Sequence, residues 1–229
     1  VSYLKGKKDQ LINILMEHTK FGMYETHKVK HDHEIFERSE FTDIPMVKQL
    51  KDKAYKQLGT SGGGNHFVEF GIVNITTTDN EWELPKGEYL GVLSHSGSRG
   101  LGANIAKHYT YLATKQCLLP KHVQQLAWLD LDTHDGQEYW LAMNLAGDYA
   151  KACHDNIHHR IAKQLGTRSV VTIENHHNFA WKQLVNGEEY IVHRKGATPA
   201  AKGELGIIPG SMTAPGFIVK GLGNPESLE

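Results

Sequence analysis

Three consecutive glycines stand directly before an Asn-His pair and a strand-like alternation in the segment LGTSGGGNHFVEFG, residues 58–71. Glycine adopts backbone conformations that other residues avoid, and it lets the chain approach a ligand closely. The residues that follow alternate between apolar and polar side chains, which favours a β-strand. The sequence therefore predicts a turn of unusual backbone geometry that delivers Asn65 and His66 to the start of a strand.

Helical and strand-like patterns follow one another along the chain in blocks. Helical spacing of apolar residues marks KKDQLINILMEH and MVKQLKDKAYKQL, and later LGANIAKHYTYLATKQCLL and DYAKACHDNIHHRIAKQLG. Strand patterns mark EYLGVLSHSGSRG, SVVTIENHHNFAW, EEYIVHRKGA and PGFIVKGLG. We therefore expect a mixed α/β fold, a single domain over residues 1–229 with a helical insert at about 103–166.

Composition excludes several classes of protein. The 229 residues carry a net charge of −1, which argues against a globally basic nucleic-acid binder but allows a local basic groove. Cys117 and Cys153 are the two cysteines, too few for a disulfide scaffold, so a reducing, cytoplasmic compartment is expected. The longest apolar runs are too short for a membrane span.

The Asn-His pair is the first constellation with chemical potential. If the strand includes these positions, His66 and Val68 share one face and Asn65 and Glu69 share the other. A neutral imidazole at His66 can bind a metal, while Asn65 and Glu69 can hydrogen-bond a polar partner.

Further polar clusters stand beside the other strand–turn junctions. In SHSGSRGLG, His95 ends a strand, and Arg99 with the backbone N–H groups of a following helix can form an anion site for phosphate. The remaining clusters are ENHHNFAW with His177, IVHRKGATPA with Arg194 and Lys195, and the tight turn IIPGSM. Histidines combined with phosphate donors suggest a divalent metal acting on a phosphorylated substrate.

Two more histidine groups have competing interpretations. His27, His31 and His33 can bind a metal or lie in a solvated, mixed-charge connector, and the connector is the favoured reading. His154 and His158 lie one helical turn apart and form either a ligand pair or a plain helix face, and the plain face is favoured.

The motifs GNHFVEF, HSGSRGLG, HHNFAW, RKGA, IIPGSM and GLGNPES occur in the order found in RtcB-type RNA ligases, which the chain resembles from about Gly59 onward. The resemblance implies an RtcB-like layered β-sheet core with flanking helices. It also implies an enzyme that joins an RNA 3′-phosphate or 2′,3′-cyclic phosphate to a 5′-hydroxyl. Such ligases use GTP and two Mn²⁺ ions and form a guanylylated histidine.

The same resemblance assigns roles to residues of this chain. The implied metal ligands are His66, His95 and His177, and the implied RNA or phosphate contacts are Arg99, Arg194 and Lys195. The implied nucleotide-binding residues are Asn65, Glu69, His177, Pro209, Gly210, Ser211 and Met212. The implied partners are tRNA halves or cleaved RNA, together with an archease-type activator.

The chain departs from the family pattern at both ends. The Asp-x-x-Cys motif of the family belongs upstream of everything in this sequence, and the His-Gly-Ala-Gly-Arg motif with the nucleophilic histidine belongs beyond Glu229. Thr213 and Pro215 follow the Ser-Met turn where the family usually has small residues. We therefore expect the middle part of a ligase, without a catalytic nucleophile of its own and unable to guanylylate itself.

Two other functions fit the same residues. One is a metal-dependent phosphoesterase, in which Glu69 or Glu174 would bridge two metals. The other is a non-catalytic relative that binds RNA or a nucleotide.

Overall fold

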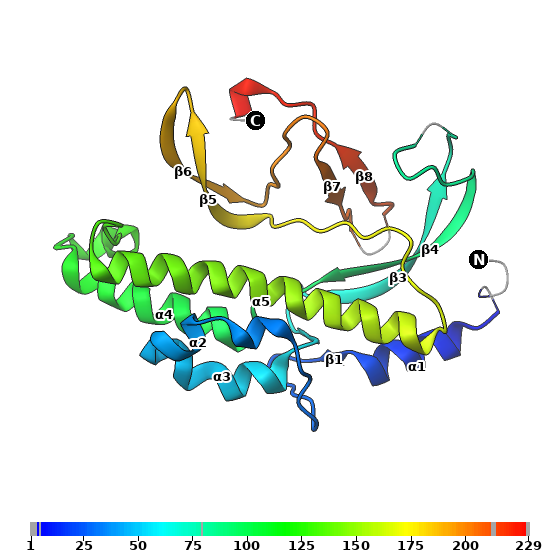
Figure 1. The fold of residues 1–229 in the computed structure, drawn as a ribbon, viewed down its shortest axis with the longest axis horizontal. Coiled ribbons are helices and arrows are strands. Elements are labelled where there is room, and N and C mark those ends of the chain that lie inside the picture. Colours follow the sequence, from blue (N-terminus) through cyan, green and yellow to red (C-terminus); the bar gives the residue numbers. More distant parts are fainter. Residues whose placement is uncertain (1–3, 5, 79, 212–213, 228–229) are drawn as a thin grey trace. The chain divides into compact units, whose positions relative to one another are not determined.

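The computed structural model describes residues 4, 6–78, 80–211 and 214–227. It divides into two compact units, Val1–Arg168 and Ser169–Glu229, and helices and strands together confirm the mixed α/β class (Figure 1). Whether the chain acts as one domain stays a prediction. The elements of the first unit are α1 (Lys8–His18), β1 (Lys20–Phe21), η2 (Glu34–Glu37), α2 (Glu40–Asp43), α3 (Pro45–Gln57), β2 (Thr60–Gly62), β3 (Phe67–Ile75), β4 (Gly87–His95), α4 (Arg99–Gln116), η3 (Lys121–Leu126) and α5 (His134–Gln164).

Helices α3, α4 and α5 pack around the main hydrophobic core of the first unit. Pro45 stands in the first turn of α3, where a missing N–H costs nothing. The side chain of Thr133 caps α5 by accepting a hydrogen bond from the N–H of Gly136 at 3.2 Å. The largest side chains buried completely in this core are Tyr109, Tyr149, Phe41, Leu58, Leu101 and Leu145.

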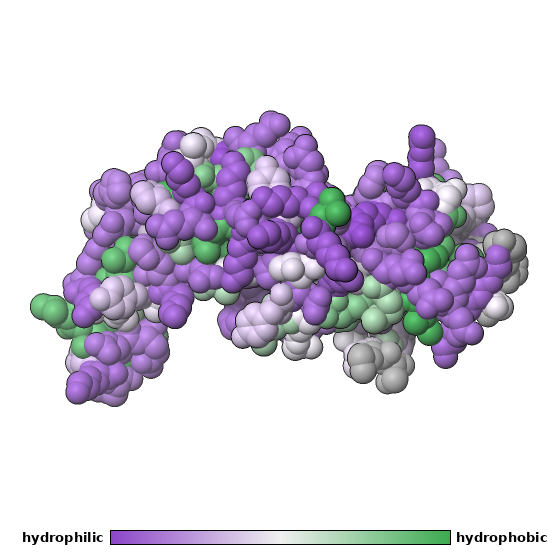
Figure 2. All heavy atoms as spheres, turned by 90° about the horizontal axis from the view of Figure 1, so that it is seen from below, coloured by the Kyte–Doolittle hydropathy of each residue, from purple (hydrophilic) through white to green (hydrophobic). Residues whose placement is uncertain are grey.

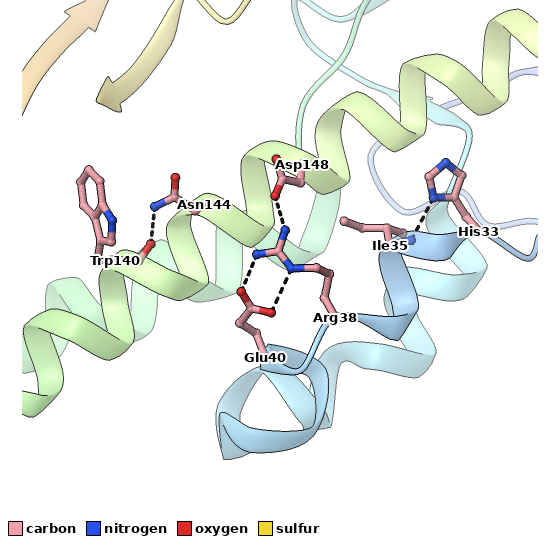
Figure 3. Close-up of polar contacts among 7 residues, drawn as sticks. All are labelled: His33, Ile35, Arg38, Glu40, Trp140, Asn144 and Asp148. Atoms are coloured by element: carbon pink, nitrogen blue, oxygen red, sulfur yellow. Dashed lines mark hydrogen bonds and ion pairs between the residues drawn. The ribbon is translucent and has the colours of Figure 1, made fainter. Parts of the chain in front are cut away.

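A polar clamp joins the segment before α2 to the middle of α5 (Figure 3). Arg38 donates to both carboxylate oxygens of Glu40, at 2.5 and 3.2 Å, and to Asp148 at 2.5 Å. Glu40 is only 6% exposed. Burial alone would raise the pKa of Glu40, but the hydrogen bonds from Arg38, a backbone hydrogen bond and the charge of Arg38 together outweigh burial and hold that pKa below its ordinary value.

Strands β3 and β4 form an antiparallel pair that carries the motifs of interest. The register places Phe67, the first residue of β3, opposite His95, the last residue of β4. The side chains of Phe67 and His95 lie on one face of this pair. Val68 lies on the opposite face, where it is buried against Ile157 and Ile161 of α5. Helix α5 therefore supports the end of the sheet at which His95 lies.

The second unit consists of two antiparallel hairpins, formed by β5 (Asn178–Val185) with β6 (Glu188–Lys195) and by β7 (Leu205–Ile208) with β8 (Phe217–Lys220), and the short η4 (Pro225–Ser227). Asn186 and Gly187 connect β5 to β6, both with positive φ, as a tight hairpin turn requires. The side chain of Asn175 bonds the backbone of β7 through Leu205 and Ile207, so it occupies the place of a strand partner.

Two predictions for the last third of the chain were wrong. SVVTIENHHNFAW was expected to be a strand throughout, but the strand begins only at Asn178, where pairing with β6 begins. The motif IIPGSM was expected to be a tight turn, whereas its first two residues, Ile207 and Ile208, belong to β7. In both cases, a segment forms a strand only where a partner strand lies beside it.

The surface of the chain is largely hydrophilic, as Figure 2 shows for one face, with apolar side chains in scattered patches. None of the helices in the part of the chain that the structure describes combines the length and apolar composition needed to cross a bilayer. In the same described residues, the strands form four two-stranded sheets.

Candidate metal and phosphate site

The glycine run makes room for two functional side chains. Gly62 has a φ of +106°, and a Cβ atom there would lie 1.9 Å from Nη1 of Arg99 and 2.7 Å from Nδ1 of His66. No L-residue with a side chain fits that space without displacing one of them. Gly64 also has a positive φ, +74°, but its Cβ would meet open space. The glycines are predicted to let the backbone approach a ligand. At Gly62, the groups that lie close to the backbone are instead the side chains of Arg99 and His66.

His66 and His95 lie next to each other where β3 begins and β4 ends. Their ring centroids are 5.8 Å apart, and the ring of Phe67 lies 5.5 Å from that of His95. A Cβ at Gly97 would lie 3.5 Å from Nε2 of His66, so this edge of the ring faces the turn after β4. The structure therefore brings together two of the three predicted metal ligands.

The predicted sorting of side chains onto faces assumed that the strand includes Asn65, but β3 begins at Phe67. Since Phe67 stands opposite His95, Glu69 lies on the same face of the sheet as His95. Glu69 is half-buried and Asn65 is exposed. The opposite face of the sheet, which packs against α5, carries the side chain of Val68.

The surroundings keep His66 neutral. Burial lowers its pKa below the ordinary value of 6.5, and the positive charge of Arg99 and the neighbouring His95 and His154 lower it further, against a hydrogen bond with the backbone of Ser61. A neutral imidazole has a lone pair available for a metal.

Arg99 is anchored inside the first unit. Its Nε donates to the hydroxyl of Thr60 at 3.0 Å, and its Nη2 donates to the carbonyls of Gly22 and Met23 at 3.3 and 3.4 Å. Its backbone is left-handed, with a φ of +52°, at the first residue of α4. Burial lowers the pKa of its guanidinium. These hydrogen bonds connect β2, α4 and the segment after β1. The motif SHSGSRGLG did not indicate this structural role of Arg99.

Two histidines of α5 contact the end of β4. Nε2 of His154 lies 3.2 Å from both the backbone nitrogen and the carbonyl oxygen of Ser96, and Nε2 of His158 lies 2.9 Å from the hydroxyl of Ser94. The favoured prediction, a plain helix face rather than a ligand pair, did not include these contacts with the strand that carries His95. Sequence spacing showed that the two histidines share a face, but not what that face contacts.

The other histidine group lies partly buried rather than in a solvated connector. Nε2 of His27 is 3.3 Å from the carbonyl of Gly59 and 3.2 Å from Nη1 of Arg160. The rings of His27 and His31 are 4.3 Å apart, and Nδ1 of His31 lies 3.1 Å from the side-chain oxygen of Asn156. Nδ1 of His33 accepts from the N–H of Ile35 and caps η2 (Figure 3). His27 and His31 thus join the chain before α2 to α5.

The remaining predicted residues belong to the second unit. His177 precedes β5 and is half-buried, and its carbonyl accepts from the N–H of Ala197 at 3.1 Å. Arg194 is 9% exposed, with its guanidinium 5.3 Å from the ring of Trp181, whereas Lys195 is exposed. The predicted nucleotide turn is exposed at Pro209, Gly210 and Ser211, and Met212 lies outside the described residues.

Within the described ranges, no group of three or more His, Cys, Asp or Glu side chains is arranged to hold a metal ion. His66 and His95 are thus a pair of neighbouring imidazoles and not a complete metal site. The hydroxyl of Ser96 beside them is buried and hydrogen-bonded to no residue that the structure describes. The fold and site define a mixed α/β protein with a histidine pair at a sheet end and an arginine at the adjoining helix start.

Comparison with known proteins identifies the family. The family model described as tRNA-splicing ligase RtcB matches residues 2–229, so the chain belongs to the RtcB family. It is 37% identical to an RNA-splicing ligase RtcB1 of Escherichia coli and 36% identical to the RtcB of strain K12, over 78% of this chain and 44% of each relative. It is 29% identical to the tRNA-splicing ligase RtcB of Methanocaldococcus jannaschii over 95% of this chain and 26% of that protein. The chain spans less than half the length of these relatives.

Proposed function

We propose that this chain is part of a GTP- and Mn²⁺-dependent RNA ligase that joins a 3′-phosphate or 2′,3′-cyclic phosphate end to a 5′-hydroxyl end. The juxtaposition of His66 and His95, with ring centroids 5.8 Å apart, carries the proposal. Family membership supports RNA ligation as the reaction class, because the relatives bear the names RNA-splicing and tRNA-splicing ligase.

The donor chemistry of the pair fits a divalent metal. Mn²⁺ accepts imidazole nitrogen together with oxygen ligands, and the surroundings of His66 favour its neutral form. In this proposal His66, His95 and His177 are ligands. A bound metal pair would supply Lewis acidity to a phosphate. The half-buried Glu69 lies on the face of His95, where its carboxylate can hydrogen-bond a nucleotide.

The remaining roles follow the resemblance. Asn65, with Pro209, Gly210, Ser211 and Met212, would bind the guanylate, and Arg99, Arg194 and Lys195 would contact RNA phosphates. The exposed Lys195 suits such a contact best, because Arg99 and Arg194 have partners within the protein. tRNA halves or cleaved RNA as substrates, an archease-type activator, and a nucleophilic histidine beyond Glu229 belong to the same proposal.

Metal binding tests the proposal at the residues that carry it. We expect Mn²⁺ to bind the wild-type chain, measured by electron paramagnetic resonance of free Mn²⁺, and His66→Ala and His95→Ala to weaken binding at least tenfold. His159→Ala, an exposed histidine on α5, is the matched control. Unchanged Mn²⁺ binding in both variants would overturn the ligand assignment.

An RNA experiment separates the ligase from its alternatives. With Mn²⁺ present, an oligonucleotide with a 3′-phosphate should bind more tightly than the same oligonucleotide with a 3′-hydroxyl. Release of inorganic phosphate without GTP would favour the phosphoesterase, which needs a bridging carboxylate. Neither Glu69 nor Glu174 stands in a three-ligand group with the histidines among the described residues.

A further inference from the structure

The helix behind His95 contacts the strand through two histidines instead of through apolar side chains alone. His154 and His158 are four residues apart on α5, so they lie on one face of the helix. Around them the contact between α5 and the sheet is apolar, formed by Ile157 and Ile161 with Val68. Placing imidazoles within such a contact is costly unless each finds a polar partner.

Both histidines find their partners in the immediate neighbours of His95. His158 reaches the hydroxyl of Ser94 at 2.9 Å, and His154 reaches the backbone of Ser96 at 3.2 Å. Helix α5 thus holds the residue before His95 and the residue after it.

The contact at Ser96 also gives a backbone group just beyond the sheet end a hydrogen-bond partner. The β3–β4 ladder stops at the pair of Phe67 and His95, so no residue of β3 stands opposite Ser96. Buried backbone groups beyond the end of a ladder need other partners. His154 supplies one: its Nε2 lies 3.2 Å from both groups of Ser96 but can serve only one of them at a time, and we take it as the acceptor of the Ser96 N–H.

Because side chains alternate between the two faces of a strand, these contacts also fix the face on which the side chain of His95 lies. With the side chain of Ser94 toward α5, the side chain of His95 lies on the opposite face, where Phe67 and His66 are its neighbours. A shift of the strand end by one residue would turn His95 away from His66.

We propose that His154 and His158 are positioning residues that fix the end of β4 and thereby hold the imidazole of His95 toward His66. The inference rests on the proposed function only in giving His95 the role of a metal ligand. Outer partners that orient a ligand typically change metal affinity by about 10–100-fold when removed.

The test uses the full chain with His154→Leu and His158→Leu, which keep an apolar helix face and remove the hydrogen bonds. His154→Gln and His158→Gln are the rescue variants, because the amide oxygen of Gln can replace Nε2. His159→Leu is the matched control on an exposed position of the same helix. Should a leucine variant unfold, the corresponding Asn variant, whose amide is too short to reach the serine, replaces it.

Two readouts do not depend on metal. We expect His154→Leu to speed hydrogen exchange of the Ser96 amide at least tenfold, and both leucine variants to shift or broaden the Cε1–H resonance of His95 in histidine-labelled protein. The Gln variants should restore both signals. Wild-type exchange at Ser96 together with an unchanged His95 resonance in the leucine variants would overturn the proposal.

The third readout is Mn²⁺ affinity, expected to fall about tenfold or more in the leucine variants and to recover in the Gln variants. If the His95 resonance changes but the Mn²⁺ affinity does not, the claim that His154 and His158 position a metal ligand is overturned. If the wild-type chain binds no Mn²⁺, the proposed function loses its metal, while the two metal-free readouts still decide whether α5 positions His95.

Discussion

The guanidinium of Arg99 occupies the space that a Cβ atom at position 62 would need, since that atom would lie 1.9 Å from Nη1. Gly62 and Arg99 are therefore a matched pair. The absence of a side chain at one position allows the other to reach Thr60 and the carbonyls of Gly22 and Met23.

Gly62→Ala should destabilise the chain more than Gly64→Ala. Both positions have positive φ, which costs an L-residue about 1–2 kcal/mol, but only Gly62 adds a clash with Arg99 and His66. Overpacking adds about 1–3 kcal/mol, so we expect a loss of roughly 2–5 kcal/mol against about 1–2 kcal/mol for Gly64→Ala. Urea unfolding measures both free energies, and equal losses would refute the pairing of Gly62 with Arg99.

Arg99→Met should lower the free energy of unfolding in the absence of RNA. The methionine keeps much of the apolar stem but loses the hydrogen bonds to Thr60, Gly22 and Met23, for a cost of about 1–3 kcal/mol. Lys107→Met, at an exposed position of α4, should change stability by less than about 0.5 kcal/mol. If Arg99→Met is as stable as wild type, the anchoring role assigned to Arg99 is wrong.

The variants Arg38→Met and Asp148→Ala should have unequal effects on stability. Arg38→Met leaves the carboxylate of Glu40, 6% exposed, without its bidentate partner (Figure 3). Asp148→Ala breaks only an exposed ion pair, worth about 0–1 kcal/mol. We expect about 1–3 kcal/mol for Arg38→Met, below the 3–5 kcal/mol of a fully buried pair because the Arg38 side chain is 40% exposed. Thermal unfolding of both variants measures the two losses of stability. A larger loss in Asp148→Ala than in Arg38→Met would contradict the prediction.

His27 should make the first unit less stable in mild acid. Burial, together with the nearby His31, Arg160 and Lys20, lowers the pKa of His27 from 6.5 to about 4, against the hydrogen bond to Gly59. Between these two pKa values the unfolded chain binds a proton that the folded chain does not, so stability falls as the pH falls from 6.5 toward 4.

His27→Gln should reduce that pH dependence. Its amide can still donate to Gly59 but does not titrate, so the drop in unfolding free energy between pH 7 and pH 5 should shrink by about 1–2 kcal/mol. His159→Gln, which alters an exposed histidine of α5, should retain the wild-type drop. Urea midpoints at the two pH values provide the measurement, and an undiminished drop in His27→Gln would show that His27 is not the group responsible.

The sequence determined most of the local structure. Helical spacing predicted α1, α3, α4 and α5, and alternation predicted β3, β4, β6 and β8, because these patterns reflect which side chains each element must bury. Ordered motifs alone led to the RtcB family, which the family match to residues 2–229 then established. The start of β5 and the existence of β7 were missed, because strands depend on partners that lie elsewhere in the chain.

Only the tertiary structure decided what each polar side chain meets. Spacing indicated that His154 and His158 share a helix face, but only the packing of α5 on β4 places that face against Ser94 and Ser96. The Gly-rich motif predicted close backbone approach, and only the fold shows Arg99 arriving there from α4. Periodicity is a local property of a sequence, whereas the partners of a buried charge or imidazole are set by contacts between residues far apart in it.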